Sequence, residues 1–219
     1  MKRRIIIGLI FYFLFAPYWV RTGEPEETII FRVKIVVDQF ISAKENWPEM
    51  ISNLAQCIND DFKKQGARVQ FEVAETATLQ IKEDIKSLRQ ALNVLMNEMP
   101  RSDYDLVIGL TDRLYDDEKG GYYSNPGYAV IRYNPYFFVY AEASSESGVA
   151  AVREKSWTMI MIMHEAGHFF GLPHLSNPES IMHDKRVLDV RQDLFLKEEI
   201  ESINKMAPVV KKEKTGAFR

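Results

Sequence analysis

The four histidines of this 219-residue chain all lie between residues 164 and 183. His164 and His168 are four positions apart, so on a helix they would share one face, where both imidazoles can reach one metal ion. Glu165 stands beside them, placed to act on a water molecule rather than to bind the metal. The pattern therefore predicts a hydrolytic metal centre built on one helix.

A turn after this helix would supply a third imidazole. Gly171 tolerates the left-handed conformation that ends helices, and such a turn would bring His174 back toward the first two histidines. Three neutral imidazoles and one water make a tetrahedral zinc site with an open position, which is typical of catalytic zinc. The alternative is a helix face with two surface histidines, and the spacing of Gly171, His174 and Met182 argues against it.

The run His-Glu-x-x-His-x-x-Gly-x-x-His, followed by Met182, resembles the signature of the metzincin zinc endopeptidases. The spacing from His174 to Met182 is similar to that of the matrixin group, while the Ser-Ile-Met-His run around Met182 is similar to the astacin Met-turn. Leu175 and Asp184 depart from the residues that the named subgroups usually carry. The resemblance is therefore to the clan, and the subgroup stays open.

We expect an endopeptidase that hydrolyses peptide bonds of proteins or peptides through a zinc-bound water. One zinc ion would be held by His164, His168 and His174, with Glu165 as the general base. By resemblance, Met182 lies under the metal as an apolar base and not as a ligand.

The substrate would be an extended peptide added to a sheet edge, because an edge strand offers unpaired backbone groups. The residues predicted to form this edge are Gly127, Tyr128, Ala129, Val130 and Ile131.

Two other classes of protein compete with the enzyme. One is a membrane-tethered, non-catalytic zinc protein with a protease-like fold, and the intact Glu165 argues against it. The other is a structural zinc protein, in which His183 or Asp184 would complete a closed site.

The segments before the histidines alternate between strand and helix patterns. The predicted elements are a strand at 32–38, a helix at 47–64, a strand at 68–73, a helix at 80–98 and a strand at 105–110. This order favours a largely parallel sheet with right-handed crossovers.

Later segments complete the predicted fold. We expect strands at 128–133 and 137–141, the metal-bearing helix at 152–170 and a closing helix from Leu196. The fold class is α+β, a zincin-like single domain whose mostly parallel twisted sheet has an antiparallel edge strand. The loop at 111–127 carries an acidic cluster, which is a weaker candidate for calcium than for a solvated loop because the ligand order of a known calcium loop is absent. The cluster consists of Asp112, Asp116, Asp117 and Glu118.

The N-terminus has the form of a secretory signal. Lys2, Arg3 and Arg4 precede an apolar run at 5–16, so export is predicted, either with cleavage or with an uncleaved signal-anchor. The predicted organisation is a signal at 1–22, a linker at 23–29, the catalytic domain at 30–207 and a disordered basic tail at 208–219.

The composition and net charge limit the classes of partner that we expect. The net charge is −3 and no basic cluster lies in the body of the chain, so a nucleic-acid partner is not expected. Cys57 is the single cysteine, which excludes an intramolecular disulfide. A monomer is expected, with membrane contact only through an uncleaved N-terminus.

Overall fold

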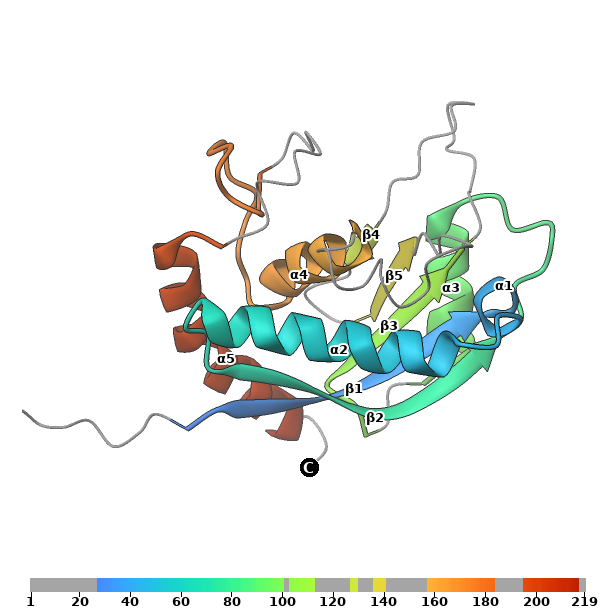
Figure 1. Ribbon diagram of the computed structural model, residues 1–219, viewed down its shortest axis with the longest axis horizontal. Coiled ribbons are helices and arrows are strands. Elements are labelled where there is room, and N and C mark those ends of the chain that lie inside the picture. The colour runs from blue at the N-terminus through green and yellow to red at the C-terminus, as the bar shows by residue number, and fades with distance from the viewer. Residues whose placement is uncertain are drawn as a thin grey trace, which may run out of the picture.

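The computed structural model describes residues 27–100, 103–112, 127–129, 136–140, 157–183 and 195–216. Five strands of this part of the chain form one sheet in the order β2-β1-β3-β5-β4 (Figure 1). The strands are β1 (Ile29–Asp38), β2 (Val69–Leu79), β3 (Leu106–Thr111), β4 (Gly127–Ala129) and β5 (Tyr136–Tyr140). All neighbours pair in parallel except β4, which pairs antiparallel with β5. The predicted mixed fold with an antiparallel edge strand is confirmed.

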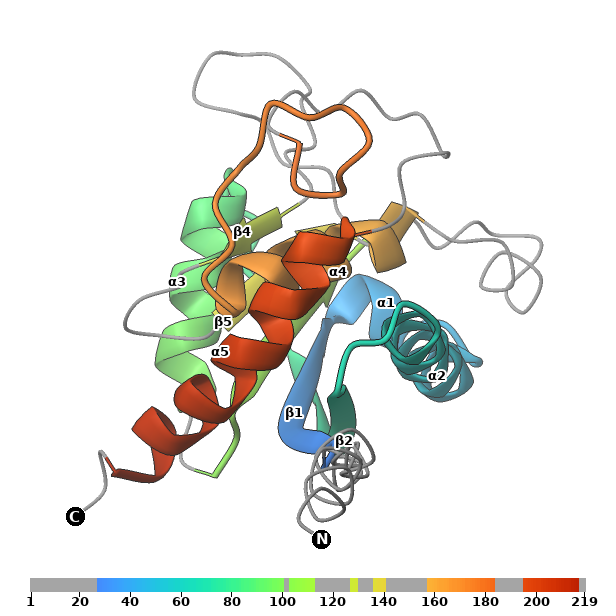
Figure 2. The same cartoon turned by 90° about the vertical axis from the view of Figure 1, so that its left-hand side faces the viewer.

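Helices cover both faces of the sheet (Figure 2). The helices are α1 (Gln39–Ser42), α2 (Trp47–Lys64), α3 (Leu88–Glu98), α4 (Trp157–Phe169) and α5 (Lys197–Gly216). Side chains of β1 alternate between two cores: Val33 and Ile35 pack with α2, α4 and α5, whereas Val36 packs with α3. This alternation follows from the two-residue period of a strand.

Helix α4, which carries the first two histidines, lies deep in the larger core. Met161, Ile162, Met163 and Ala166 are all at most 3% exposed. A helix that is apolar nearly all round is buried on nearly all sides, so its position is fixed by packing rather than by surface contacts. The predicted first residues of this helix, 152–156, lie outside the described residues.

The second strand is longer than its hydrophobic pattern predicted. β2 continues to Leu79, and its register with β1 shifts between Val33 and Lys34, where Ala74 is left unpaired. Beyond this bulge the residues of β2 are mostly exposed, since β2 is an edge strand. An exposed stretch has no apolar signal, which is why the prediction stopped at residue 73.

The predicted helix at 80–98 begins too early. α3 starts at Leu88, after a capping box: the Ser87 hydroxyl accepts from the Gln90 backbone nitrogen, and Oε1 of Gln90 accepts from the Ser87 backbone nitrogen. Ile81 is buried in the α3 core, but its backbone is held by the side-chain amide of Gln39. The Ile81 side chain therefore fits the apolar spacing of a helix, although its backbone is not helical.

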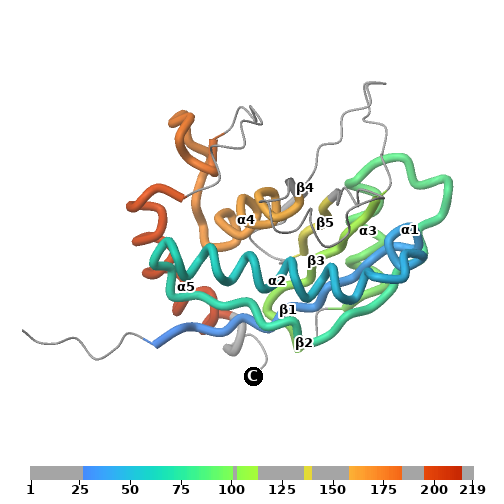
Figure 3. Tube along the Cα trace, in the orientation of Figure 1, coloured from blue at the N-terminus to red at the C-terminus, as the bar shows by residue number. Residues whose placement is uncertain are grey.

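The prediction of a disordered tail is wrong for residues 208–216, which continue α5 through Pro208. Lys211 connects this part of the helix to the rest of the fold: its Nζ lies 2.5 Å from a carboxylate oxygen of Asp105 and 5.5 Å from the ring centre of Phe31. The helix thus lies beside the start of β1, which itself begins at Ile29, inside the predicted linker (Figure 3).

The N-terminal segment predicted to be a signal lies outside the described residues. Within the described part, no helix is both long enough and apolar enough to span a bilayer.

Candidate metal centre

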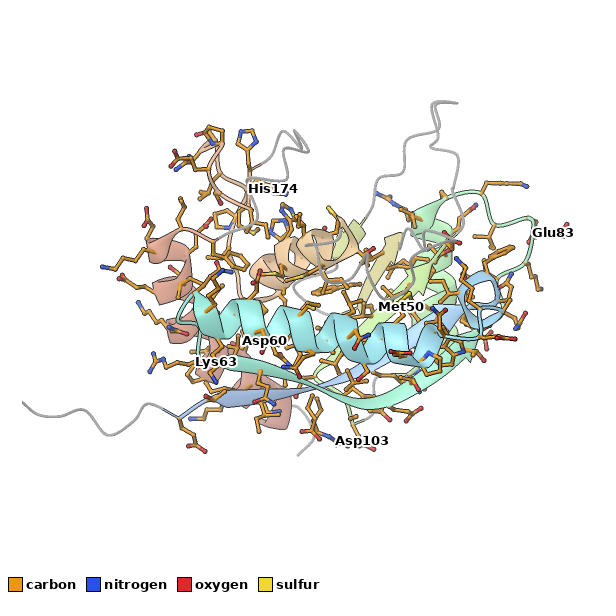
Figure 4. All side chains as sticks on the ribbon, viewed as in Figure 1. Met50, Asp60, Lys63, Glu83, Asp103 and His174 are labelled. Atoms are coloured by element: carbon orange, nitrogen blue, oxygen red, sulfur yellow. The ribbon has the colours of Figure 1, made fainter. Side chains whose placement is uncertain are left out.

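The turn after α4 brings the third histidine back to the helix. Gly171 has φ +87°, the left-handed conformation predicted for it. Its nitrogen donates to the His168 carbonyl at 2.9 Å, and the Leu172 nitrogen donates to the Gly167 carbonyl at 3.0 Å. This pair of bonds is a Schellman motif, which ends the helix and reverses the chain. Figure 4 shows His174 on the loop that follows.

The three predicted ligands meet at one point. The Nε2 atom of His174 lies 3.2 Å from Nε2 of His164 and 2.9 Å from Nε2 of His168. One ligand atom from each ring falls within a cluster 4.8 Å across. Among the described residues, this is the group of side chains that could hold a metal ion, and His183 is not part of it. The other candidate fourth ligand, Asp184, lies outside the described residues.

Backbone carbonyls fix the proton on two of the rings. Nδ1 of His164 lies 2.7 Å from the Ile181 carbonyl oxygen, and Nδ1 of His168 lies 2.8 Å from the Leu172 carbonyl oxygen. A carbonyl oxygen only accepts, so each Nδ1 must carry the proton and donate it. In the neutral rings Nε2 then presents a lone pair to the centre, which is the form a metal ligand needs.

These residues fit zinc. Zinc–nitrogen bonds of about 2.0–2.1 Å in a tetrahedron place two ligand nitrogens roughly 3.3 Å apart, close to the two distances from Nε2 of His174 to the other rings. Nε2 of His174 can share a proton with only one of the other two rings. The remaining lone pairs would face one another at short range, which a cation between them turns from repulsion into binding.

Exposure changes across the site. His164 is 4% exposed, whereas His168 is half-buried and His174 is exposed. The centre therefore has a closed side within the core and an open side at the surface. Glu165, the predicted general base, is only 3% exposed although it follows His164 directly on α4.

Met182 packs directly against the backbone of α4. Its side chain is fully buried, and a Cβ added to Gly167 would overlap Met182 Sδ and come within 3.2 Å of its Cε. The Leu175 nitrogen donates to the Met182 carbonyl at 2.8 Å, which ties the turn to the segment that carries His174. The expected apolar support is thus in contact with the helix of the metal centre.

Sequence reasoning missed several supporting groups. The carbonyls of Leu172 and Ile181 carry no signal of residue type, because any residue provides one. Gly167 did carry a signal: a glycine inside a helix costs about 1 kcal/mol relative to alanine and suggests a close approach. Ser180 belongs to the Ser-Ile-Met-His run, but its type alone does not indicate the partners of its hydroxyl.

The predicted substrate edge is described in part. Gly127, Tyr128 and Ala129 form β4, the last strand of the sheet, and α4 lies against β4 and β5. Val130 and Ile131 lie outside the described residues.

The acidic cluster of the loop at 111–127, the weaker candidate for calcium binding, is likewise described only at its first residue, Asp112. Asp112 pairs with Lys44 at 2.6 Å, so its carboxylate already has a cationic partner. The other three acidic residues of that cluster lie outside the described residues.

Known structures share this fold. The chain is similar to archaemetzincin from Methanopyrus kandleri, with 16% identity and a TM-score of 0.58, over 85% of this chain and 99% of that one. It is also similar to a chain in a structure of a chaperone–substrate complex, with 18% identity and a TM-score of 0.55. That match covers 84% of this chain but only 35% of the other, so this chain spans about a third of its length. At these identities the likeness concerns the fold.

The family comparison concerns the sequence. A search of curated proteins finds no match. The model of the metallo-peptidase family M12B, reprolysin-like, matches residues 49–175, which is more than half of the 219 residues and includes all three histidines of the centre. The chain therefore belongs to the reprolysin-like metallo-peptidase family M12B.

Proposed function

We propose that the protein is a zinc-dependent endopeptidase that cleaves peptide bonds in proteins or peptides. One observation carries the proposal: Nε2 atoms of three histidines converge, and backbone carbonyls hold two of the rings in the tautomer that binds metal. Family membership and the archaemetzincin-like fold support it. The closeness to the matrixin group that the Met-turn spacing suggests remains a prediction.

His164, His168 and His174 would hold the ion, and zinc bound there supplies a Lewis acid for the scissile carbonyl. Glu165 follows a ligand on α4, placed to take the proton of the attacking water and deliver it to the leaving amine. Glu165 is only 3% exposed, which limits competing solvation of its carboxylate by bulk water. Positioned transfer of this kind contributes typically 10²–10⁴-fold to rate.

The substrate peptide would add to β4 as a further strand. β4 ends the sheet, so its outer edge is the one from which backbone groups can pair with an extended chain. We propose Gly127, Tyr128 and Ala129 as the described part of this edge, continued by Val130 and Ile131.

The test is peptide hydrolysis by the parent and by Glu165→Ala, read by mass spectrometry on a peptide library with zinc content measured in parallel. Since Glu165 is not a ligand, the variant should keep zinc and melting temperature but lose about a thousand-fold or more in turnover. Activity within tenfold of the parent removes Glu165 from the base role. Loss of zinc together with activity would make it a ligand, and a parent that binds zinc but cleaves nothing favours a non-catalytic zinc protein.

We also propose that residues 1–22 direct export, because basic residues precede an apolar run there. A reporter fused after Arg219 should be active only outside the cytoplasm. Cytoplasmic activity of the reporter would refute this.

A further inference from the structure

A buried carboxylate links α5 to the loop behind the metal centre. Glu199 is 4% exposed and has no part in the proposed chemistry. Its Oε1 accepts the Ser180 hydroxyl at 2.6 Å, and its Oε2 accepts the Leu196 nitrogen at 2.5 Å. Both oxygens act as acceptors, which suits an ionised carboxylate. Burying such a group is costly unless it is hydrogen-bonded, so losing either of these two hydrogen bonds would be unfavourable.

Ser180 carries this link onward to the Met-turn. The side chain is 1% exposed, and its oxygen accepts the Met182 nitrogen at 2.8 Å while its hydrogen goes to Glu199. The residue between them is Ile181, whose carbonyl orients the His164 ring at 2.7 Å. One short segment is therefore tied to α5 on one side and directs a metal ligand on the other.

Other hydrogen bonds hold α5 and its start without passing through Ser180. Asn204, further along α5, accepts from the Arg68 nitrogen at 2.7 Å and donates to the Gly66 carbonyl at 3.0 Å. Just before the helix, the Phe195 nitrogen donates to the Gln65 side chain at 2.8 Å. α5 is thus also tied to the turn between α2 and β2, through hydrogen bonds that are separate from the Glu199–Ser180 link.

We propose that Glu199 is a positioning residue of the metal centre: through Ser180 it sets the Ile181 carbonyl and, with it, the His164 ring. This rests on the proposed function, because it takes the three histidines to be zinc ligands. Groups that orient a metal ligand typically change metal affinity by 10–100-fold when they are removed. A carboxylate that only stabilised α5 would affect folding without that selective loss.

The test measures zinc affinity of the full chain by competition with a chromophoric chelator, and the absorption of the Co²⁺-substituted protein. Glu199→Ala and Ser180→Ala should each weaken zinc binding by roughly 10–100-fold and alter the Co²⁺ spectrum. The matched control is Asn204→Ala, which also removes two hydrogen bonds of α5 but lies off this link. It should lower the melting temperature and leave zinc affinity within about threefold of the parent, as for a site with no shared partners.

Two further variants sharpen the outcome. Glu199→Gln keeps the size and one acceptor, so its zinc affinity should lie between those of the parent and Glu199→Ala. The double variant Glu199→Ala/Ser180→Ala should lose little more affinity than either single variant, since both act through one link. If Glu199→Ala does not fold, Glu199→Gln decides, because Ser180→Ala also removes the bond to the Met182 nitrogen.

The inference is overturned if Glu199→Ala, or Glu199→Gln where that variant decides, weakens zinc binding no more than Asn204→Ala does. It is also overturned if the two losses of affinity multiply in the double variant. A parent that binds no zinc would contradict the proposed function itself and the inference with it. Zinc binding by the parent with unchanged affinity in the variants would remove the inference alone.

Discussion

Gly167→Ala should destabilise the protein, although alanine is the better helix former. Its Cβ would lie 3.0 Å from Phe195 Cε1 and 3.2 Å from Met182 Cε, and nearer still to Met182 Sδ. Carbon atoms pack best at about 3.5–4.0 Å, so both side chains would have to move. Phe195 is 6% exposed and Met182 fully buried, which leaves them little room.

The magnitude is the difference of two effects. Overpacking a buried site costs about 1–3 kcal/mol. Replacing glycine by alanine inside a helix gains about 1 kcal/mol. We expect a net loss of up to about 2 kcal/mol in the free energy of unfolding, measured by urea denaturation in excess chelator so that bound metal does not contribute.

A double-mutant cycle identifies the cause of that loss. Met182→Ala alone should cost about 2–5 kcal/mol through the cavity it leaves. In that background Gly167→Ala should cost less or become stabilising, because the nearest obstruction is gone. A gain of about 1 kcal/mol for Gly167→Ala alone, or strict additivity of the two changes, would refute the close packing of Met182 on the helix.

Two further predictions concern the metal and the pH dependence of stability. His168→Ala should lose tightly bound zinc, since two imidazoles make a poor site; metal analysis that shows full zinc retention would mean that the ligands are misassigned. Burial raises the pKa of Asp38 above its ordinary value of 3.8, against the lowering effect of its hydrogen bonds to Thr111, Ile41 and Phe40. The folded state therefore binds that proton more tightly than the unfolded state, and the contribution of Asp38 to stability falls as pH rises from the ordinary to the raised pKa. The stability of Asp38→Asn relative to the parent should accordingly rise as the pH increases above about 4 in urea unfolding, and a relative fall would contradict this.

The metal centre was accessible from sequence because its parts are close along the chain. The four-residue spacing of His164 and His168 predicts that they share one helix face, and Gly171 predicts the turn that brings His174 back to them. The groups that hold these rings were not accessible, because the Ile181 and Leu172 carbonyls are backbone atoms. Glu199 contacts Ser180 in the loop behind the centre from another element, and only the tertiary fold brings the two together.

The fold shows a similar division. The helix at Trp47–Lys64 was predicted with the bounds observed, because one of its faces is strongly apolar and Gly66 follows it. The beginning of α3 was missed because burial of Ile81 imitates a helical period. The end of α5 was missed because a basic sequence looks solvated, while Lys211 finds a carboxylate 106 positions away.

The central claim is that three imidazole nitrogens bind one zinc ion and leave one position open. X-ray absorption at the zinc edge, on the full chain loaded with one zinc per molecule, measures the ligands directly. We predict three imidazole nitrogens and one oxygen from water at about 2.0–2.1 Å. Two imidazoles, or a fourth ligand from the protein in a closed site, would contradict the account.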